Sequence, residues 1–193
     1  MAQVSNQEEV KVFKAGDPIV HPARGAGIVL CVEQRNCHGN SDLYYRISLL
    51  GHQEISLLIP VNAAEALGLR PAISPSSLNR VWGVLGGAPN TLPADHKERY
   101  ELLEDKLHTG DIFQIAEAVR DMAWRQHQQG RPTTVGKQIY EQGIALLAGE
   151  IAASQDTDVT NAEDQIKARL MESLLPDHPD APLASRTPGR AAM

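Results

Sequence analysis

The chain has 193 residues, of which 42% are apolar, so it can bury one or two modest hydrophobic cores, and we expect two small domains. Its formal net charge is −6 and no region is basic, which argues against an autonomous DNA binder, since such proteins use Lys and Arg to neutralise phosphates. No apolar run approaches the roughly 18 residues that cross a bilayer, and the polar start has no signal-peptide core, so we expect a cytoplasmic protein without a membrane partner.

Short apolar runs rich in β-branched residues occupy the first sixty positions, at residues 18–21, 27–33, 43–50 and 54–59. The segments between them, at 23–25, 37–41 and 51–53, have the length and composition of turns or hairpin loops. Such alternation of apolar runs and turns indicates four or five short strands. Strands this short close best as a small barrel.

After about residue 75 the apolar residues follow a helical period, and each segment begins with a residue that can cap a helix. The candidate caps are Ser76 or Ser77, Asp95, Asp111, Thr134 and Thr160. The second helix should end at Gly110 and the third near Gly130, because glycine commonly follows a helix C-terminus. Connections of only a few residues then predict an antiparallel bundle of about five helices.

The boundary between the two modules is expected near Arg70-Pro71, because proline disfavours helix in the residue before it. The chain then divides into a flexible N-terminus at 1–12, a β-module at 13–70 and a helical module at 71–175. Residues 176–193 are rich in Pro, Ala and Ser without periodicity, which predicts a disordered tail. The expected fold class is α+β, with a small β-barrel followed by an all-α bundle.

The two cysteines, Cys31 and Cys37, are too few for a disulfide framework, and we interpret them as small hydrophobic residues. A zinc site can be imagined from them with His21 and His38, but structural zinc usually shows paired ligands at two-to-four spacing. We therefore expect no metal and no other cofactor.

Two patterns that could indicate an enzyme fail on inspection. Residues 130–138, GRPTTVGKQ, place five residues instead of four before Gly136-Lys137, and Gln138 stands where a phosphate-binding loop needs Ser or Thr. Asp17, His21 and a nearby serine lack the nucleophile elbow of a hydrolase. The sequence predicts a non-enzymatic protein, and the natural use of a small barrel is to pair its strand edge with another protein.

A run of motifs in both modules resembles a known family. GDPIVHPARGAG at residues 16–27 opens the β-module, and further motifs follow in order along the chain. These are Ile59-Pro60, Ala64-Glu65, Leu67-Gly68-Leu69-Arg70, Val81-Trp82, Val84-Leu85, Ala88-Pro89, Arg99-Tyr100, Lys106-Leu107, Gly110-Asp111 and residues 116–121. On these residues, from about 13 to 153, the chain resembles the CarD/CdnL family of bacterial RNA polymerase-binding transcription regulators.

The resemblance implies a Tudor-like N-terminal domain that pairs its strand edge with the RNA polymerase β subunit, and a helical domain placed against promoter DNA. It implies a monomer that acts at the promoter open complex and is associated with the nucleoid through the polymerase. A family arginine on the polymerase-facing surface aligns with Arg35, which could pair with a carboxylate in bidentate geometry. A second aligns with Leu58, so this interface should depend more on backbone pairing and apolar contact, with Cys37 as a candidate.

The helical module departs further from the family. Relatives often place a tryptophan against the minor groove at a position that aligns with His96, where a wedge occupies an unstacked step. Positions usually basic in relatives align with Glu98 and Glu101, and the local positive charges are Lys97 and Arg99. DNA contact is therefore expected to be weak and confined to the polymerase complex.

An alternative aromatic and cation for DNA are Trp124 and Arg125, near the end of the third helix, although Trp124 also fits a core position. The competing interpretation is a divergent adaptor that keeps polymerase docking, makes little DNA contact and recruits another factor.

Overall fold

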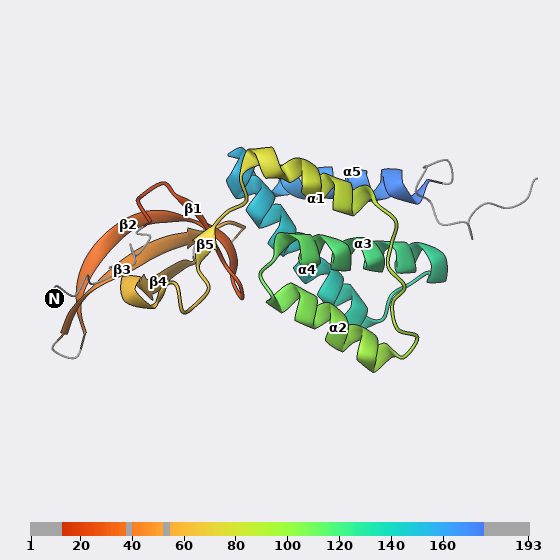
Figure 1. Ribbon diagram of the computed structural model, residues 1–193, viewed down its shortest axis with the longest axis horizontal. Coiled ribbons are helices and arrows are strands. Elements are labelled where there is room, and N and C mark those ends of the chain that lie inside the picture. Colours follow the sequence, from red (N-terminus) through yellow and green to blue (C-terminus); the bar gives the residue numbers. More distant parts are fainter. Residues whose placement is uncertain (1–12, 38–39, 52–54, 176–193) are drawn as a thin grey trace, which may run out of the picture.

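The computed structural model describes residues 13–37, 40–51 and 55–175, with only the backbone described at Cys37 and Asn40. The predicted flexible N-terminus and disordered tail lie outside these residues. Figure 1 shows two modules side by side along the long axis, an N-terminal sheet and a C-terminal group of helices. The two-module α+β fold predicted from the sequence is confirmed.

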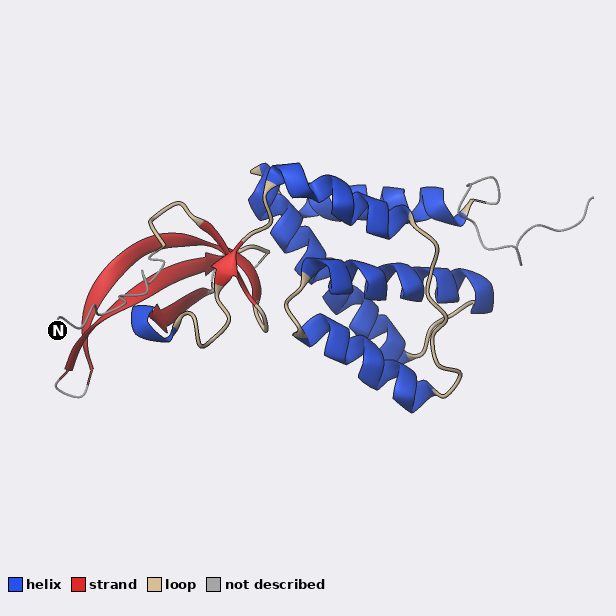
Figure 2. Ribbon diagram, viewed as in Figure 1, coloured by secondary structure: helices blue, strands red, loops and turns tan. Residues whose placement is uncertain are grey.

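The N-terminal module is an antiparallel five-stranded sheet of order β4-β3-β2-β1-β5. Its strands are β1 (Pro18–His21), β2 (Gly25–Cys37), β3 (Asn40–Leu49), β4 (Ser56–Pro60) and β5 (Arg70–Pro71). The sheet is strongly curved (Figure 2). Among the described residues, β4 and β5 are its two edges and do not pair with each other, so it is an open form of the predicted barrel.

Alternation of buried and exposed residues explains how the sheet covers a core. Ile19, Val29, Tyr45, Ile47 and Ile59 point to one side and are almost fully buried. The hairpin of β2 and β3 is longer than its apolar runs predict, because backbone pairing continues through polar residues to Cys37 and Asn40. Arg70-Pro71, near which the module boundary was expected, forms β5 and pairs with Ile19 and Val20, so the last strand of the sheet stands at that boundary.

The C-terminal module contains five α-helices among the described residues, in agreement with the sequence. They are α1 (Leu78–Gly86), α2 (His96–His108), α3 (Ile112–Gln129), α4 (Thr134–Gln155) and α5 (Val159–Leu174). In Figure 1, α3 and α4 lie between α2 on one side and α1 with α5 on the other. One buried apolar cluster with contributions from all five helices forms the core.

The helix caps correct three of the predictions. Asp95 and Asp111 cap α2 and α3 as expected, accepting hydrogen bonds from backbone N–H groups of the first turn. Thr133 rather than Thr134 caps α4, and Asp158 rather than Thr160 caps α5. Ser77 occupies the N-cap position of α1, but its side chain makes no capping hydrogen bond, because residues 75–77 form a 3₁₀ turn that continues directly into the helix.

The two modules meet where α4 packs against β1 and β2. The salt bridge between Arg70 of β5 and Glu150 of α4 crosses this interface, and the Glu150 side chain is only 2% exposed. Both oxygens of Glu150 accept from Arg70, and one also accepts the backbone N–H of Ile73 at 3.0 Å. This contact ties the sheet to the longest helix of the bundle.

Candidate functional site

The candidate polymerase-binding residues lie on the face of the sheet opposite its core, here called the outer face. In an antiparallel sheet, residues paired across strands share a face. Arg46 of β3 pairs with Cys31 of β2 on one side and with Leu58 of β4 on the other. Two positions further along β2, Glu33 and then Arg35 continue the same face, so the structure brings Arg35 and Leu58 onto one surface.

One carboxylate organises the charges of the outer face. Glu33 accepts from Nε of Arg35 at 2.5 Å and from Nε of Arg46 at 3.0 Å. The hydrogen bond from Arg35, followed by that from Arg46, holds the pKa of Glu33 below its usual range. Two guanidinium groups therefore share the carboxylate of Glu33, and Asp42 of β3 stands across from Arg35 on the same face, so the two basic and two acidic residues there balance in formal charge.

Arg46 is a residue that the sequence analysis missed. Leu58 is 40% exposed and pairs directly with Arg46 on the neighbouring strand. The presence of Leu58 predicts the loss of one charged contact with the polymerase, but the guanidinium of Arg46 lies beside that position. The alternation of residues in β3 could have indicated this, since Arg46 lies between the buried Tyr45 and Ile47. The pairing with β4, however, depends on a register that composition does not fix. The side chain of Cys37 lies outside the described residues.

Two strand edges border the outer face. Within the described residues, β4 pairs only with β3, and β2 pairs with β1 only over residues 25–28. The remaining backbone of β2, from Leu30 toward the hairpin tip, thus forms an edge that a strand of another protein can extend. Leu30 and Val32 are exposed along this edge and offer apolar contact.

The candidate DNA-binding residues of α2 are divided between its surface and its interior. His96 has a side chain that is 76% exposed, with its ring edge-on to Tyr100 and its Nδ1 3.9 Å from Asp95. Lys97 is also exposed and faces Glu101 at 3.8 Å. Acidic neighbours therefore accompany both exposed groups, which weakens the attraction of this surface for phosphate.

Arg99 differs from the expectation of an exposed cation, because it is 6% exposed. Its Nη1 donates to the backbone carbonyls of Pro93, Ala94 and Asp95, at 2.8 to 3.3 Å. The guanidinium thus holds the segment before α2 against the helix. One side of Arg99 still lines a cavity, together with Arg125 of α3.

Trp124 and Arg125 lie together at the C-terminal half of α3. Trp124 is half-buried, tilted against His127, and lines a groove with Pro89, Thr91 and other residues of the loop between α1 and α2. It is not among the residues that form or pack against the helical core. This placement favours the alternative in which Trp124 is available to a ligand.

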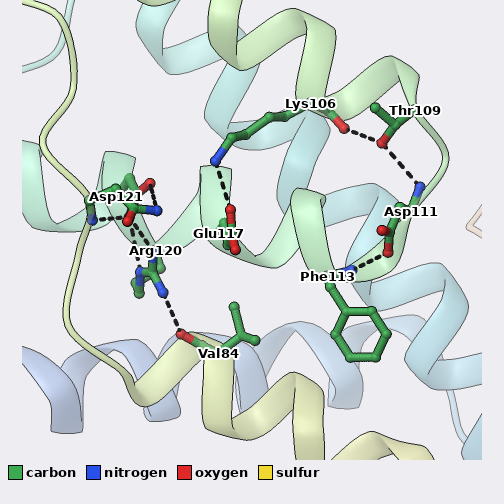
Figure 3. A network of polar contacts seen from close by, with 9 residues as sticks. Val84, Lys106, Thr109, Asp111, Phe113, Glu117, Arg120 and Asp121 are labelled. Atoms are coloured by element: carbon green, nitrogen blue, oxygen red, sulfur yellow. Dashed lines mark hydrogen bonds and ion pairs between the residues drawn. The ribbon is translucent and has the colours of Figure 1, made fainter.

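A buried polar network fixes the wall of this groove. Asp121 accepts the backbone N–H of Asn90 at 2.9 Å, and its Oδ1 also accepts from Nε and Nη2 of Arg120. Figure 3 shows Arg120 reaching on to the carbonyl oxygen of Val84 at the end of α1, a contact of 3.2 Å. The loop from α1 to α2 is therefore held against α3 by hydrogen bonds rather than by apolar packing alone.

Comparisons with known proteins agree with this arrangement. Residues 13–73 match the family described as CarD-like/TRCF RID domain, and residues 80–167 match the family described as CarD, C-terminal domain. The Bacillus subtilis (strain 168) protein named "Putative transcription factor YdeB" is 31% identical over 113 residues, which cover 58% of this chain and 72% of that protein. The chain belongs to the CarD-like family of transcription factors.

The CarD-like assignment confirms the resemblance found in the sequence and identifies the β-module as a Tudor-like domain of the RID type. It supports a regulator of transcription rather than an enzyme. Within the part of the chain that the structure describes, no helix is long and apolar enough to cross a membrane. Among the same residues, no three His, Cys, Asp or Glu side chains are grouped as a metal site would require.

Proposed function

We propose that this CarD-like protein is a non-catalytic transcription regulator that docks on the β subunit of RNA polymerase through its β-module and acts at the promoter open complex through its helical module. The observation that carries the proposal is the outer face, where Arg35, Arg46 and Leu58 gather beside two available strand edges. Backbone pairing along an edge provides affinity, and the arginines provide selectivity for a partner with an acidic side chain.

The position of the helical module supports action on DNA held by the polymerase. The buried Arg70–Glu150 contact fixes this module relative to the docking sheet, so docking also positions Trp124 and Arg125. An aromatic ring and a guanidinium can contact an unstacked base step and its phosphate. The net charge of −6 makes a strong contact with free DNA unfavourable, so the polymerase must bring the two together.

Co-purification with RNA polymerase tests the docking step. The full chain should associate with the polymerase, and its presence should lengthen the lifetime of the promoter open complex. Failure to associate, under conditions where another CarD-like protein does so, would contradict the proposal.

A second candidate function is an adaptor that docks on the polymerase and recruits another factor. The exposed carboxylates of Glu98 and Glu101, on the helix that carries His96, favour it because they repel phosphate. Tight polymerase binding with an unchanged open-complex lifetime would support the adaptor. If the family geometry is retained, His96→Trp should then lengthen that lifetime by restoring an aromatic wedge.

A further inference from the structure

A cavity of about 120 Å³ lies between α2, the C-terminal half of α3 and the segment that leads into α4. Part of its lining is apolar and comes from Leu92, Leu103 and Met122, which form or pack against the helical core. Leu103 is 1% exposed, whereas Arg131 at the opposite end of the lining is exposed, so the hollow reaches from the surface to the core. An apolar cavity of about 150 Å³ holds one benzene ring, which sets the size of a ligand that this hollow can take.

Three guanidinium groups share this hollow with the apolar side chains. They belong to Arg99, Arg125 and Arg131, and none of the ion pairs found among the described residues includes them. Arg99 is engaged by the backbone, because its Nη1 donates to the carbonyls of Pro93 and Ala94. Burial, and then the charge of Arg99, lower the pKa of Arg125. Within the described part of the chain no Asp or Glu lines the cavity, so an anion there would relieve the repulsion between these cations.

The combination of an apolar wall and unpaired cations defines the chemistry of the ligand. Inorganic phosphate would pair with the cations but leave the leucine and methionine side chains against water. A neutral ring would cover those side chains but leave the cations without a partner. Pockets for small molecules combine a largely apolar lining with a few placed polar groups, and this cavity has that character.

We propose that the cavity is a binding site for a small amphipathic anion, namely a single ring or a short aliphatic chain that carries one carboxylate or phosphate monoester group. The apolar body lies against Leu103 and Met122, and the anionic group lies between Arg125 and Arg131. Such a ligand is a free small molecule, because a nucleic-acid strand would place polar sugar and phosphate groups against the apolar wall.

Occupation of this site has a consequence for the neighbouring groove. Leu92, Arg125 and Gln129 line both the cavity and the groove that holds Trp124. A bound anion neutralises Arg125 and removes a positive charge beside the indole ring, so the ligand should shorten the lifetime of the promoter open complex. This regulatory step rests on the proposed function, whereas binding of the anion by the free chain does not.

The test uses the full chain without polymerase and phenyl phosphate as the probe, with binding measured by calorimetry and by tryptophan fluorescence. Phenyl phosphate should bind roughly tenfold or more tightly than inorganic phosphate or phenol, because it alone satisfies both parts of the site. Benzoate, in a parallel titration, tells whether a carboxylate serves as well as a phosphate ester; either anion binding in this way supports the site.

Two arginine variants and one leucine variant locate the probe. Arg125→Gln and Arg131→Gln should each weaken its binding roughly three- to tenfold, because each loses a charge-assisted contact. Leu92→Ala should weaken phenyl phosphate but not inorganic phosphate. Arg24→Gln is the matched control, because Arg24 is an exposed arginine of the β-module without an ion pair among the described residues. Thermal unfolding of each variant excludes misfolding as the cause.

Several results would overturn the inference. They are the absence of saturable binding by both aromatic anions, equal affinities for phenyl phosphate and inorganic phosphate, and equal losses in Arg24→Gln. Tighter, Arg131-dependent binding of single-stranded pentathymidylate would assign the cavity to a strand instead. A final measurement adds phenyl phosphate to the polymerase complex: an unchanged open-complex lifetime would overturn the regulatory step alone. A chain that binds the probe but never lengthens that lifetime would contradict the proposed function and leave the site standing.

Discussion

The guanidinium of Arg70 and the carboxylate of Glu150 form a two-point ion pair between β5 and α4, with Nη1–Oε1 at 2.6 Å and Nη2–Oε2 at 2.8 Å. Arg70 also donates to the carbonyl oxygen of Gly110, in the loop between α2 and α3. A single side chain thus joins the sheet to two places in the helical module. For a protein proposed to dock with one module and act with the other, this contact determines their relative orientation.

Removal of Arg70 should destabilise the protein strongly. Arg70→Met leaves the carboxylate of Glu150 buried without its partner, and loss of one member of a buried pair costs about 3–5 kcal/mol. Urea unfolding at pH 7 measures this loss. Lys137→Met is the matched control, because its partner Glu141 lies 3.5 Å away on the exposed side of α4, and such pairs contribute less than about 1 kcal/mol. Similar losses in the two variants would contradict the role of burial.

Asp121 should control the order of the loop between α1 and α2. Asp121→Asn removes the charge that accepts from Arg120 and Asn90, which should lower the free energy of unfolding by about 3 kcal/mol and speed exchange of the Asn90 amide. Hydrogen exchange and urea unfolding together measure both effects. Asp105→Asn, an exposed change on α2, should leave them unaltered. Unchanged exchange at Asn90 in Asp121→Asn would show that other contacts order the loop.

The elements that could be predicted from the sequence are those with local causes. Asp95 is followed three residues later by Glu98, as in a capping box, and Asp111 precedes an apolar stripe, so local sequence alone indicates both caps and both helices. At α4 two adjacent threonines can cap, and only tertiary placement selects Thr133, whose hydroxyl also contacts Tyr100. Local composition cannot resolve such a choice.

The parts of the candidate site that could not be predicted depend on distant partners. Arg46 enters the outer face through its register with Leu58, and Arg99 is buried because the carbonyls of the preceding loop turn toward it. In each case the sequence around a charged residue does not indicate its role, because that role depends on the residues that pack against it in the fold.

Two glycine-to-alanine substitutions should have opposite effects. A Cβ added at Gly27 would lie 2.6 Å from the carbonyl oxygen of Ser48 on β3, so Gly27→Ala should destabilise the sheet by roughly 1–3 kcal/mol. A Cβ at Gly83 of α1 meets nothing within 4 Å, and Gly83→Ala should stabilise by up to about 1 kcal/mol through helix propensity. Thermal or urea unfolding compares the pair. Stabilisation by Gly27→Ala would contradict this prediction, since it would mean that β2 and β3 can move apart to admit the methyl group without loss of stability.

Stability should fall as the pH drops below about 6.5, with His21 as one cause. Burial, and then the charge of Arg24, lower the pKa of His21 from its ordinary value of 6.5, and its Nδ1 accepts from the backbone N–H of Ala23. Because the pKa of His21 is lower in the folded state, the unfolded chain takes up the proton first as the pH falls. The contribution of neutral His21 to the free energy of unfolding is therefore complete above pH 6.5 and is lost as the pH falls from 6.5 to the folded-state pKa. Urea unfolding between pH 7.5 and 5.5 should give a flatter profile for His21→Asn. Equal pH profiles for wild type and His21→Asn would refute this assignment.

Arg46 should be a determinant of polymerase binding. The family arginine that aligns with Leu58 is absent from this chain, and Arg46 on the neighbouring strand offers a guanidinium in its stead. Arg46→Gln should weaken association with the polymerase β subunit roughly three- to tenfold, because a charge-assisted contact is lost while Glu33 keeps Arg35 in position. The double variant Arg46→Gln/Leu58→Arg returns a guanidinium to the same row of the sheet, one strand away, and should recover much of the affinity.

Surface plasmon resonance on immobilised polymerase measures both variants, with Arg24→Gln as a control for total charge. Undiminished binding of Arg46→Gln would leave Arg35 and backbone pairing as the basis of docking. If Arg46→Gln loses affinity and the double variant does not recover it, the partner requires a positive charge on β3 itself. The contact then depends on the strand that carries the charge and not only on the face of the sheet.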